Sequence, residues 1–274
     1  MSGATQGDGT VGKALAVLDR VAAFGRPVRF GELLDDSPYP KATLYRFVQT
    51  LTSQGMLSFD PERQTYAPGL RLVRLAHAAW EQSSLAPVAR PYLDALSADI
   101  GETVHLAQLD GGQVLYVDKR NAREPIEMFS QAGKVGPAYC TGVGKAMLAW
   151  VEPEALERAL SQQSYHRFTD HTLTSPRDVE AELARIRARG HAFDDEEHEP
   201  GIICIAVPIL TPQFRMLGAL SVTTSTTRND LAGLAKLAPQ LRATADDIAR
   251  EARNWRFPDQ TRQDLDRGKE RCRA

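Results

Sequence analysis

Basic, hydroxyl and amide side chains are concentrated in one short stretch of the chain, which starts at Lys41. In a helix over 41–54 the apolar side chains recur every three or four positions, which leaves the polar side chains on the opposite face. Such polar groups bind phosphate oxygens and the edges of bases. We therefore expect double-stranded DNA as the partner of this face, contacted by Lys41, Ala42, Thr43, Tyr45, Arg46 and Gln49.

A second candidate site lies at Thr141-Gly142-Val143-Gly144, where glycines open a helix predicted over 142–151. The N–H groups and the positive dipole end of a helix start bind anions such as a carboxylate, and Thr141 adds a hydroxyl. Alternatively, the glycines only allow a tight turn into the helix. A nucleotide-binding loop is excluded because Ala146 follows Lys145 and Tyr139 stands where that loop requires glycine.

Two helices and a turn precede the first candidate site. The three-and-four spacing of apolar residues predicts a first helix over 11–24 and a short second helix over 31–36. Ser37-Pro38-Tyr39-Pro40 is typical of a turn, and its last proline suits the first turn of a new helix. This arrangement predicts a helix-turn-helix whose last helix carries the outward polar face.

A small hairpin follows that helix, which Gly55 ends. The runs 56–59 and 64–66 have the composition of strands, and the turn between them adds Arg63 to the expected DNA contacts. Residues 11–69 are therefore predicted to form a winged helix-turn-helix. The alternative is a small three-helix subdomain whose Lys and Arg side chains are merely solvated.

The charge of this region favours a dimer. Residues 1–69 contain seven basic and seven acidic side chains, whereas 40–54 contain Lys41 and Arg46 and no acid. Net positive charge is thus focused on the binding helix, and one copy would bind DNA weakly. Two copies on a two-fold axis would meet pseudo-palindromic half-sites about 34 Å apart.

Residues 70–83 are predicted to be a linker helix with an apolar surface broader than a monomer core needs. We expect it to dimerise the chain, and two dimers could associate further into a tetramer. The alternative is a helix packed within one subunit against the next helix, 85–100.

Residues 84–255 are predicted to form an α+β domain in which helices flank an antiparallel sheet. The expected strands are 102–109, 114–118, 126–131, 202–210 and 217–224, and the expected helices are 85–100, 142–151, 153–160, 176–189 and 230–252. The two ends, 1–10 and 256–274, have the composition of disordered segments.

Composition indicates a cytoplasmic protein. The 274 residues are 42% hydrophobic and carry 33 basic and 35 acidic side chains, without an apolar run long enough for a membrane span or the plan of a signal peptide. The three cysteines (Cys140, Cys204 and Cys272) have no paired spacing, so we expect reduced thiols rather than disulfides.

Several motifs occur in an order that is typical of one known family. They are Lys41-Ala42-Thr43-Leu44-Tyr45-Arg46-Phe47, Gly55-Met56-Leu57, Tyr66-Ala67-Pro68-Gly69-Leu70, Thr141-Gly142-Val143-Gly144-Lys145-Ala146, Thr172-Leu173-Thr174, Asp195-Glu196-Glu197, Gly201, Cys204-Ile205-Ala206-Val207-Pro208 and Ala219-Leu220-Ser221-Val222. Over about 11–253 the chain resembles the IclR family of bacterial transcriptional regulators. Within that family it most resembles the subgroup that represses 2-keto-3-deoxygluconate catabolism, through Glu102-Thr103-Val104-His105-Leu106, Leu148-Ala149-Trp150 and Cys204-Ile205-Ala206-Val207-Pro208.

The resemblance implies a DNA-binding regulator whose second domain resembles GAF and PAS sensors and binds a small effector. By their positions in the matching motifs, effector-binding roles fall on Met128, Asp194, Cys204, Ser221 and Thr223. Ser221 and Thr223 alternate onto one face of a strand, as hydroxyls of a pocket should. Taken alone, each of these residues also fits a structural role, such as a small core residue for Cys204.

One residue departs from the family's pattern. The family's binding helix usually starts with Lys-Ser-Thr, whereas this chain has Ala42 between Lys41 and Thr43. A hydroxyl that could contact phosphate is therefore missing, and orientation on DNA should rest more on the two neighbours.

Catalysis and metal binding are not expected. A Cys-His hydrolase would need Cys140 or Cys204 beside a histidine, and the esterase motif Gly-x-Ser-x-Gly is absent. The histidines and the Asp195-Glu196-Glu197 run lack the helical spacing of paired metal ligands. We therefore predict an effector-controlled repressor of a sugar-acid or other carboxylic-acid operon, without cofactor. The alternative is a hydrolase-like enzyme with an accessory helix-turn-helix.

Overall fold

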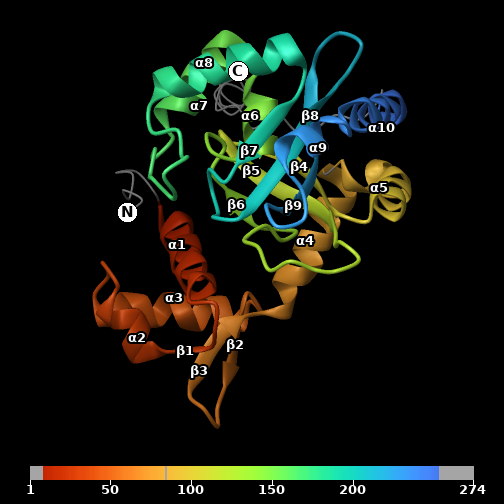
Figure 1. Cartoon of the computed structure of the whole chain (residues 1–274). Coiled ribbons are helices and arrows are strands. Elements are labelled where there is room, and N and C mark those ends of the chain that lie inside the picture. The colour runs from red at the N-terminus through yellow and green to blue at the C-terminus, as the bar shows by residue number, and fades with distance from the viewer. Residues whose placement is uncertain (1–8, 84, 253–274) are drawn as a thin grey trace, which may run out of the picture. The chain divides into compact units, whose positions relative to one another are not determined.

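A computed structural model of the chain describes residues 9–83 and 85–252 (Figure 1). These residues form two compact units, which divide along the chain between Ala79 and Trp80. The predicted α+β fold class is confirmed, with a helix-turn-helix and small sheet followed by an antiparallel sheet flanked by helices. The segments 1–8 and 253–274, which hold most of the stretches expected to be disordered, lie outside the described residues.

The first unit contains three helices and a three-stranded antiparallel sheet in the order β1-β3-β2. Its elements are α1 (Thr10–Ala23), β1 (Val28–Arg29), α2 (Phe30–Asp35), α3 (Lys41–Ser53), β2 (Leu57–Asp60) and β3 (Thr65–Pro68). The apolar stripe of α3 (Leu44, Phe47, Val48 and Leu51) is buried in one core with residues of α1 and the sheet. The two-residue strand β1 was not predicted, because it exists only through its pairing with β3.

Helix α4 (Leu70–Ser83) begins in the first unit and ends in the second. Gly69 precedes it and packs so closely that a Cβ there would lie 2.2 Å from the Gly55 carbonyl oxygen. Arg71 donates to the Gln54 carbonyl oxygen at 2.9 Å, which fixes the start of the helix. Near its other end, the Trp80 indole N–H donates to the Val117 carbonyl oxygen at 3.1 Å.

The second unit is built on a six-stranded antiparallel sheet in the order β6-β5-β4-β9-β8-β7. Its strands are β4 (Thr103–Asp110), β5 (Gln113–Arg120), β6 (Val135–Gly136), β7 (Ala192–Asp195), β8 (Ile202–Leu210) and β9 (Met216–Ser225). Its helices are α5 (Ala86–Ile100), α6 (Gly142–Leu148), α7 (Pro153–Ser161), α8 (Pro176–Arg189), α9 (Leu231–Ala235) and α10 (Ala238–Glu251).

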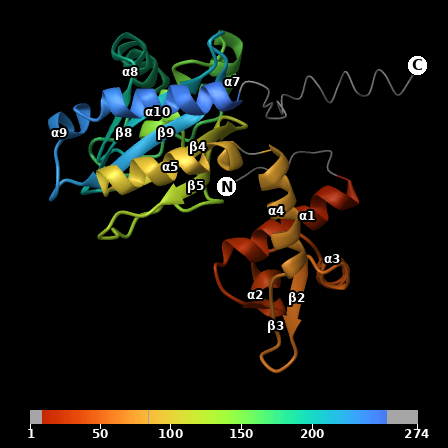
Figure 2. The ribbon, with the colours of Figure 1, turned by 90° about the vertical axis from the view of Figure 1, so that its right-hand side faces the viewer.

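The helices cover the two faces of this sheet in separate groups. Helices α5 and α10 lie side by side on one face (Figure 2), where they bury one large apolar core with alternate residues of β4, β8 and β9. Helices α6, α7 and α8 bury a second core on the opposite face. No helix of residues 9–83 and 85–252 is long and apolar enough to cross a membrane.

Two predictions about elements were wrong. Residues 126–131 form no strand, because their backbone and side chains bond to residues far along the chain instead of to a neighbouring strand. The helix predicted over 230–252 is divided into α9 and α10, since Pro239 in the first turn of α10 has no N–H for a continuous helix. Strands β6 and β7 were not predicted; with two and four residues, they are too short for a clear alternation.

Candidate nucleic-acid interface and ligand cavity

Helix α3 presents the predicted polar face to solvent. Lys41, Arg46 and Gln49 are exposed, and within the described part of the chain neither the Lys41 nor the Arg46 side chain has a protein hydrogen-bond partner. Tyr45 is 53% exposed and packs edge-on against Phe30, with ring centroids 5.7 Å apart. Ala42 is exposed and Thr43 partly so. The surface therefore offers two cations and an aromatic hydroxyl from a rigid helix.

The hairpin adjoining α3 carries Arg63 at its exposed turn. One oxygen of Asp60 accepts the backbone N–H groups of Glu62 and Arg63, at 2.9 and 3.1 Å, which fixes the shape of the turn. Gln49 hydrogen-bonds the hydroxyl of the largely buried Tyr66, so this side chain also ties the helix to the hairpin.

A cavity of about 420 Å³, counting the space at its mouth, lies in the second unit. Eight of the nine predicted effector residues line it: Met128, Thr141, Gly142, Val143, Asp194, Cys204, Ser221 and Thr223. They come from the irregular segment before β6, the start of α6 and strands β7, β8 and β9. The ninth, Gly144, is not in the lining.

The two glycines at the start of α6 are required by close contacts. A Cβ on Gly142 would lie 2.4 Å from the Cys204 sulfur, inside the cavity wall. A Cβ on Gly144 would lie 2.4 Å from the Ala138 carbonyl oxygen, away from the cavity. The packing role that the sequence left open therefore applies to Gly144, whereas Gly142 both packs and lines the cavity.

The Thr141 hydroxyl does not cap α6. It donates to the Pro137 carbonyl oxygen at 2.7 Å, so its remaining capacity toward the cavity is that of an acceptor. It therefore suits a ligand hydroxyl better than a ligand carboxylate.

His105 of β4 is a central lining residue that sequence reasoning missed. It is only 2% exposed, and its Nε2 lies 2.8 Å from the Ser130 hydroxyl. Its Nδ1 lies 3.4 Å and 3.3 Å from the hydroxyls of Ser221 and Thr223. Burial, aided by the charge of Lys119, lowers the pKa of His105 to about 3, so the ring is neutral at pH 7.

The irregular segment 121–134 lines one side of the cavity. The Phe129 N–H donates to both carboxylate oxygens of Glu199, at 2.9 and 3.1 Å. Lys119 donates to the Ser130 carbonyl oxygen at 2.8 Å. Although burial raises the pKa of Glu199, its hydrogen bonds to His198 and to the Phe129 amide lower it below its usual range, which keeps this carboxylate charged.

Three charged side chains lie together beside the cavity. Lys145 of α6 forms an ion pair with Glu197, and both are buried. Asp194 lines the cavity and accepts the Glu197 backbone N–H at 2.8 Å. Burial, and then the charge of Glu197, raises the pKa of Asp194 to about 7. Lys145 thus balances only one of the two neighbouring carboxyl groups.

The cavity lacks the arrangement of a hydrolase. Burial raises the pKa of the Cys140 and Cys204 thiols, so neither is a ready nucleophile. His105 touches serine hydroxyls, but its Nδ1 faces Ser221 and Thr223 rather than an orienting carboxylate.

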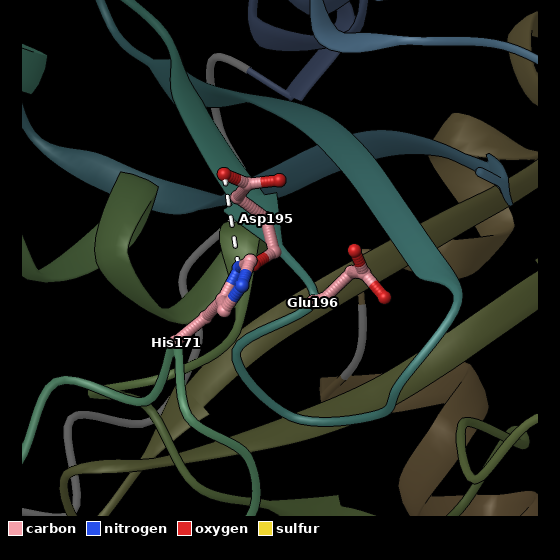
Figure 3. Close-up of side chains that lie close together, drawn as sticks. All are labelled: His171, Asp195 and Glu196. Carbon is pink, nitrogen blue, oxygen red and sulfur yellow. Dashed lines mark hydrogen bonds and ion pairs between the residues drawn. The ribbon is translucent and has the colours of Figure 1, made fainter.

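A separate cluster of His171, Asp195 and Glu196 lies near the surface (Figure 3). The His171 ring approaches Asp195, with Nδ1 2.8 Å from the backbone oxygen of that residue. Glu196 accepts the Gly201 N–H at 2.5 Å. These contacts give the cluster a structural role in the turn after β7, and the expectation that the chain binds no metal stays a prediction.

Models of two known protein domains match the chain. The helix-turn-helix domain of IclR matches residues 10–61, and the C-terminal domain of the bacterial transcriptional regulator IclR matches residues 77–250. The chain belongs to the IclR family of bacterial transcriptional regulators. It is therefore a DNA-binding regulator with a ligand-binding domain, and the prediction that it is not an enzyme is confirmed.

Individual IclR-family proteins agree with this assignment. XynR of Escherichia coli is 32% identical over 232 residues, which cover 85% of this chain and 92% of XynR. KdgR of Dickeya chrysanthemi is 33% identical over 221 residues, 80% of this chain and 72% of KdgR. The crystal structure of the Thermotoga maritima IclR has a TM-score of 0.69 at 28% identity, covering 88% of this chain and 98% of that one. Two regulators match almost equally, so similarity singles out no subgroup of the family.

Proposed function

We propose that this IclR-family regulator is a cytoplasmic repressor of an operon for a carboxylic or sugar acid, and that an acid of this kind is its effector. The proposal rests on one observation: the chain that carries the exposed Lys41 and Arg46 on α3 also contains a cavity lined by hydroxyls and a helix start. An acid of the 2-keto-3-deoxygluconate type combines one carboxylate with several hydroxyls, which matches these groups.

DNA recognition would centre on α3 in the major groove, with Arg63 of the hairpin on the backbone. Lys41, Thr43 and Arg46 would supply phosphate and base contacts, and Tyr45 an aromatic hydroxyl. Ala42 offers only a methyl group, which suits close approach to the DNA rather than a hydrogen bond.

A homodimer would present two such helices to a pseudo-palindromic operator. The support lies on α4, where Leu70 is 83% exposed, Val73 64% and Leu75 50%. Three large apolar side chains exposed on one short helix suit burial against a second copy. Two dimers could pair into a tetramer on a longer operator.

The effector cavity would receive the carboxylate at the start of α6 and the hydroxyls at Ser221, Thr223 and His105. An effector changes DNA affinity only if it binds two settings of the dimer unequally. Helix α4, which is anchored in both units by Arg71 and Trp80, is the element that would transmit this difference.

Gel-shift titration on the DNA upstream of the chain's own gene tests the proposal. We expect a retarded complex that 2-keto-3-deoxygluconate or a related acid dissociates. A complex indifferent to every acid tested would contradict the effector class, and a complex that acids strengthen would contradict repression.

Arg46→Ala removes one exposed cation from α3. We therefore expect operator binding to weaken at least tenfold, and the slope of log K against log salt concentration to become shallower by about one. Lys13→Ala is the matched control, since Lys13 is an exposed cation on α1. Fluorescence anisotropy with labelled operator at several salt concentrations gives both quantities. Equal losses in the two variants would argue against α3 as the binding helix.

A further inference from the structure

The carboxyl groups beside the cavity outnumber the cations that can balance them. Asp194 and Glu197 are both buried, and Lys145, which is itself 1% exposed, pairs with Glu197. Of the fifteen residues that line the cavity, none is Lys or Arg. An ionised Asp194 would therefore be an unbalanced buried charge, which is costly in a low-dielectric site.

The start of α6 lies on the same wall as Asp194. The position of a Cβ on Gly142 is 3.5 Å from the Asp194 backbone nitrogen and 2.4 Å from the Cys204 sulfur. An effector carboxylate held by the first turn of α6 would thus adjoin Asp194. Two adjoining ionised carboxylates in a buried site repel each other strongly, whereas an acid and a carboxylate share a hydrogen bond.

We propose that Asp194 is protonated in the effector complex and donates this proton in a hydrogen bond to the effector's carboxylate. The cavity then takes up a monocarboxylate together with one proton from solvent. This inference rests on the proposed function, and it makes Asp194 a hydrogen-bond donor to the effector. Charge balances: the anionic effector adds one negative charge, and the proton removes that of Asp194.

The other groups that face Asp194 do not supply this proton. The pKa of each of three neighbours is raised by burial, which keeps the Cys140 and Cys204 thiols and the Tyr116 hydroxyl neutral. Lys145 forms an ion pair with Glu197. The pKa of Glu197 is raised, because its burial outweighs the opposing effect of Lys145. Glu199 stays charged through His198 and the Phe129 amide, and the ring of His105 is neutral.

The same arrangement selects the class of effector. A second negative charge, as in a dicarboxylate or a phosphorylated acid, would meet Glu199, which His198 already partners, and no lining Lys or Arg. We therefore expect the cavity to prefer an acid with one carboxylate and uncharged hydroxyls over its phosphorylated or dicarboxylic counterpart.

Isothermal titration with 2-keto-3-deoxygluconate at pH 6, 7 and 8, in buffers of different ionisation enthalpy, tests the proposal. With the pKa of Asp194 at about 7, the Kd should rise about tenfold from pH 6 to pH 8, with uptake of nearly one proton at pH 8. Asp194→Asn keeps the acceptor of the Glu197 amide and a donor toward the effector, so its Kd should be the same at pH 6 and pH 8. Asp195→Asn, at the exposed neighbour, should keep the wild-type dependence.

The ¹³C-carboxyl titration of Asp194, assigned by comparison with Asp194→Asn, separates this inference from the effector's identity. A midpoint near pH 7 without effector supports the inference about Asp194, whether or not 2-keto-3-deoxygluconate binds. Failure of 2-keto-3-deoxygluconate to bind would overturn only the sugar-acid proposal. A midpoint near pH 4 overturns the inference. Binding by the wild type that is equally tight at pH 6 and pH 8, without proton uptake, overturns it as well.

Discussion

At the scale of single residues, two glycines two positions apart have different roles. Gly144 avoids a clash with the Ala138 backbone, whereas Gly142 leaves room for the Cys204 sulfur in the cavity wall. Neither has a positive φ, so contact rather than backbone conformation requires glycine at both positions. The start of α6 is therefore matched to a residue of β8 sixty-two positions later in the chain.

Gly142→Ala should lower the free energy of unfolding of the second unit by about 1–3 kcal/mol, because the new methyl group would overlap the Cys204 sulfur. Cys204→Ala removes that sulfur, so the double variant should recover part of the loss. Urea unfolding of the four proteins gives the coupling energy, expected at about 0.5–3 kcal/mol. Gly31→Ala, in open space on α2, controls for added methyl groups. Strictly additive losses would argue against the contact.

The sequence could identify residues whose local pattern carries the signal. Ser221 and Thr223 alternate with apolar residues in one strand, and the glycines of α6 precede an apolar helix. His105 likewise lies between the apolar residues Val104 and Leu106, and this alternation was the signal that could have identified it. Its role was missed because its partner Ser130 lies on an irregular segment that no local pattern brings to β4.

At the scale of elements, the irregular segment 121–134 shows where local patterns mislead. Ile126, Met128 and Ser130 alternate as in a strand, yet the segment has no strand partner along 126–131. The Phe129 amide is held by Glu199, seventy residues later, and Ser130 by His105. Tertiary hydrogen bonds have replaced sheet pairing, and these could not be read from the neighbouring residues.

Glu199→Ala should loosen this segment, because it removes both acceptors of the Phe129 amide. Hydrogen exchange followed by mass spectrometry should show faster exchange in peptides covering 126–131, by about tenfold for a loss of about 1.4 kcal/mol. Glu127→Ala changes an exposed carboxylate within the same segment and should leave exchange as in the wild type. Unchanged exchange in Glu199→Ala would mean that other contacts hold the segment.

At the scale of the whole molecule, α4 is the covalent link between a DNA-binding unit and an effector-binding unit. Its first turn is fixed by Arg71 to Gln54, and its last turns are fixed by Trp80 to Val117 on β5. The Arg90 guanidinium also lies over the Trp80 ring, 4.7 Å from its centre. Strand β5, which carries the cavity-lining residue Tyr116, is therefore hydrogen-bonded directly to this helix.

Trp80→Phe should reduce the effect of the effector on operator affinity several-fold while both separate affinities change little, because the hydrogen bond to Val117 is lost and an aromatic ring is kept. A loss of about 0.5–2 kcal/mol of coupling is expected. Anisotropy titrations with and without effector measure it. Trp150→Phe is the control, since its indole nitrogen is buried without a hydrogen-bond partner among the described residues. If the effector changes operator affinity as much in Trp80→Phe as in the wild type, the bond from Trp80 to Val117 does not couple the two sites.

The central parts of strands β4, β8 and β9 divide their side chains between the two faces of the sheet. Leu106, Ile205 and Leu220 belong to the core under α5 and α10, while the next residues along reach the cavity side, including His105, Cys204 and Ser221. Alternate residues of the same strands thus serve two purposes: one set packs the core, and the other set lines the cavity. Evolution can therefore substitute the cavity-lining residues one at a time and change the effector, while the core residues keep the domain folded.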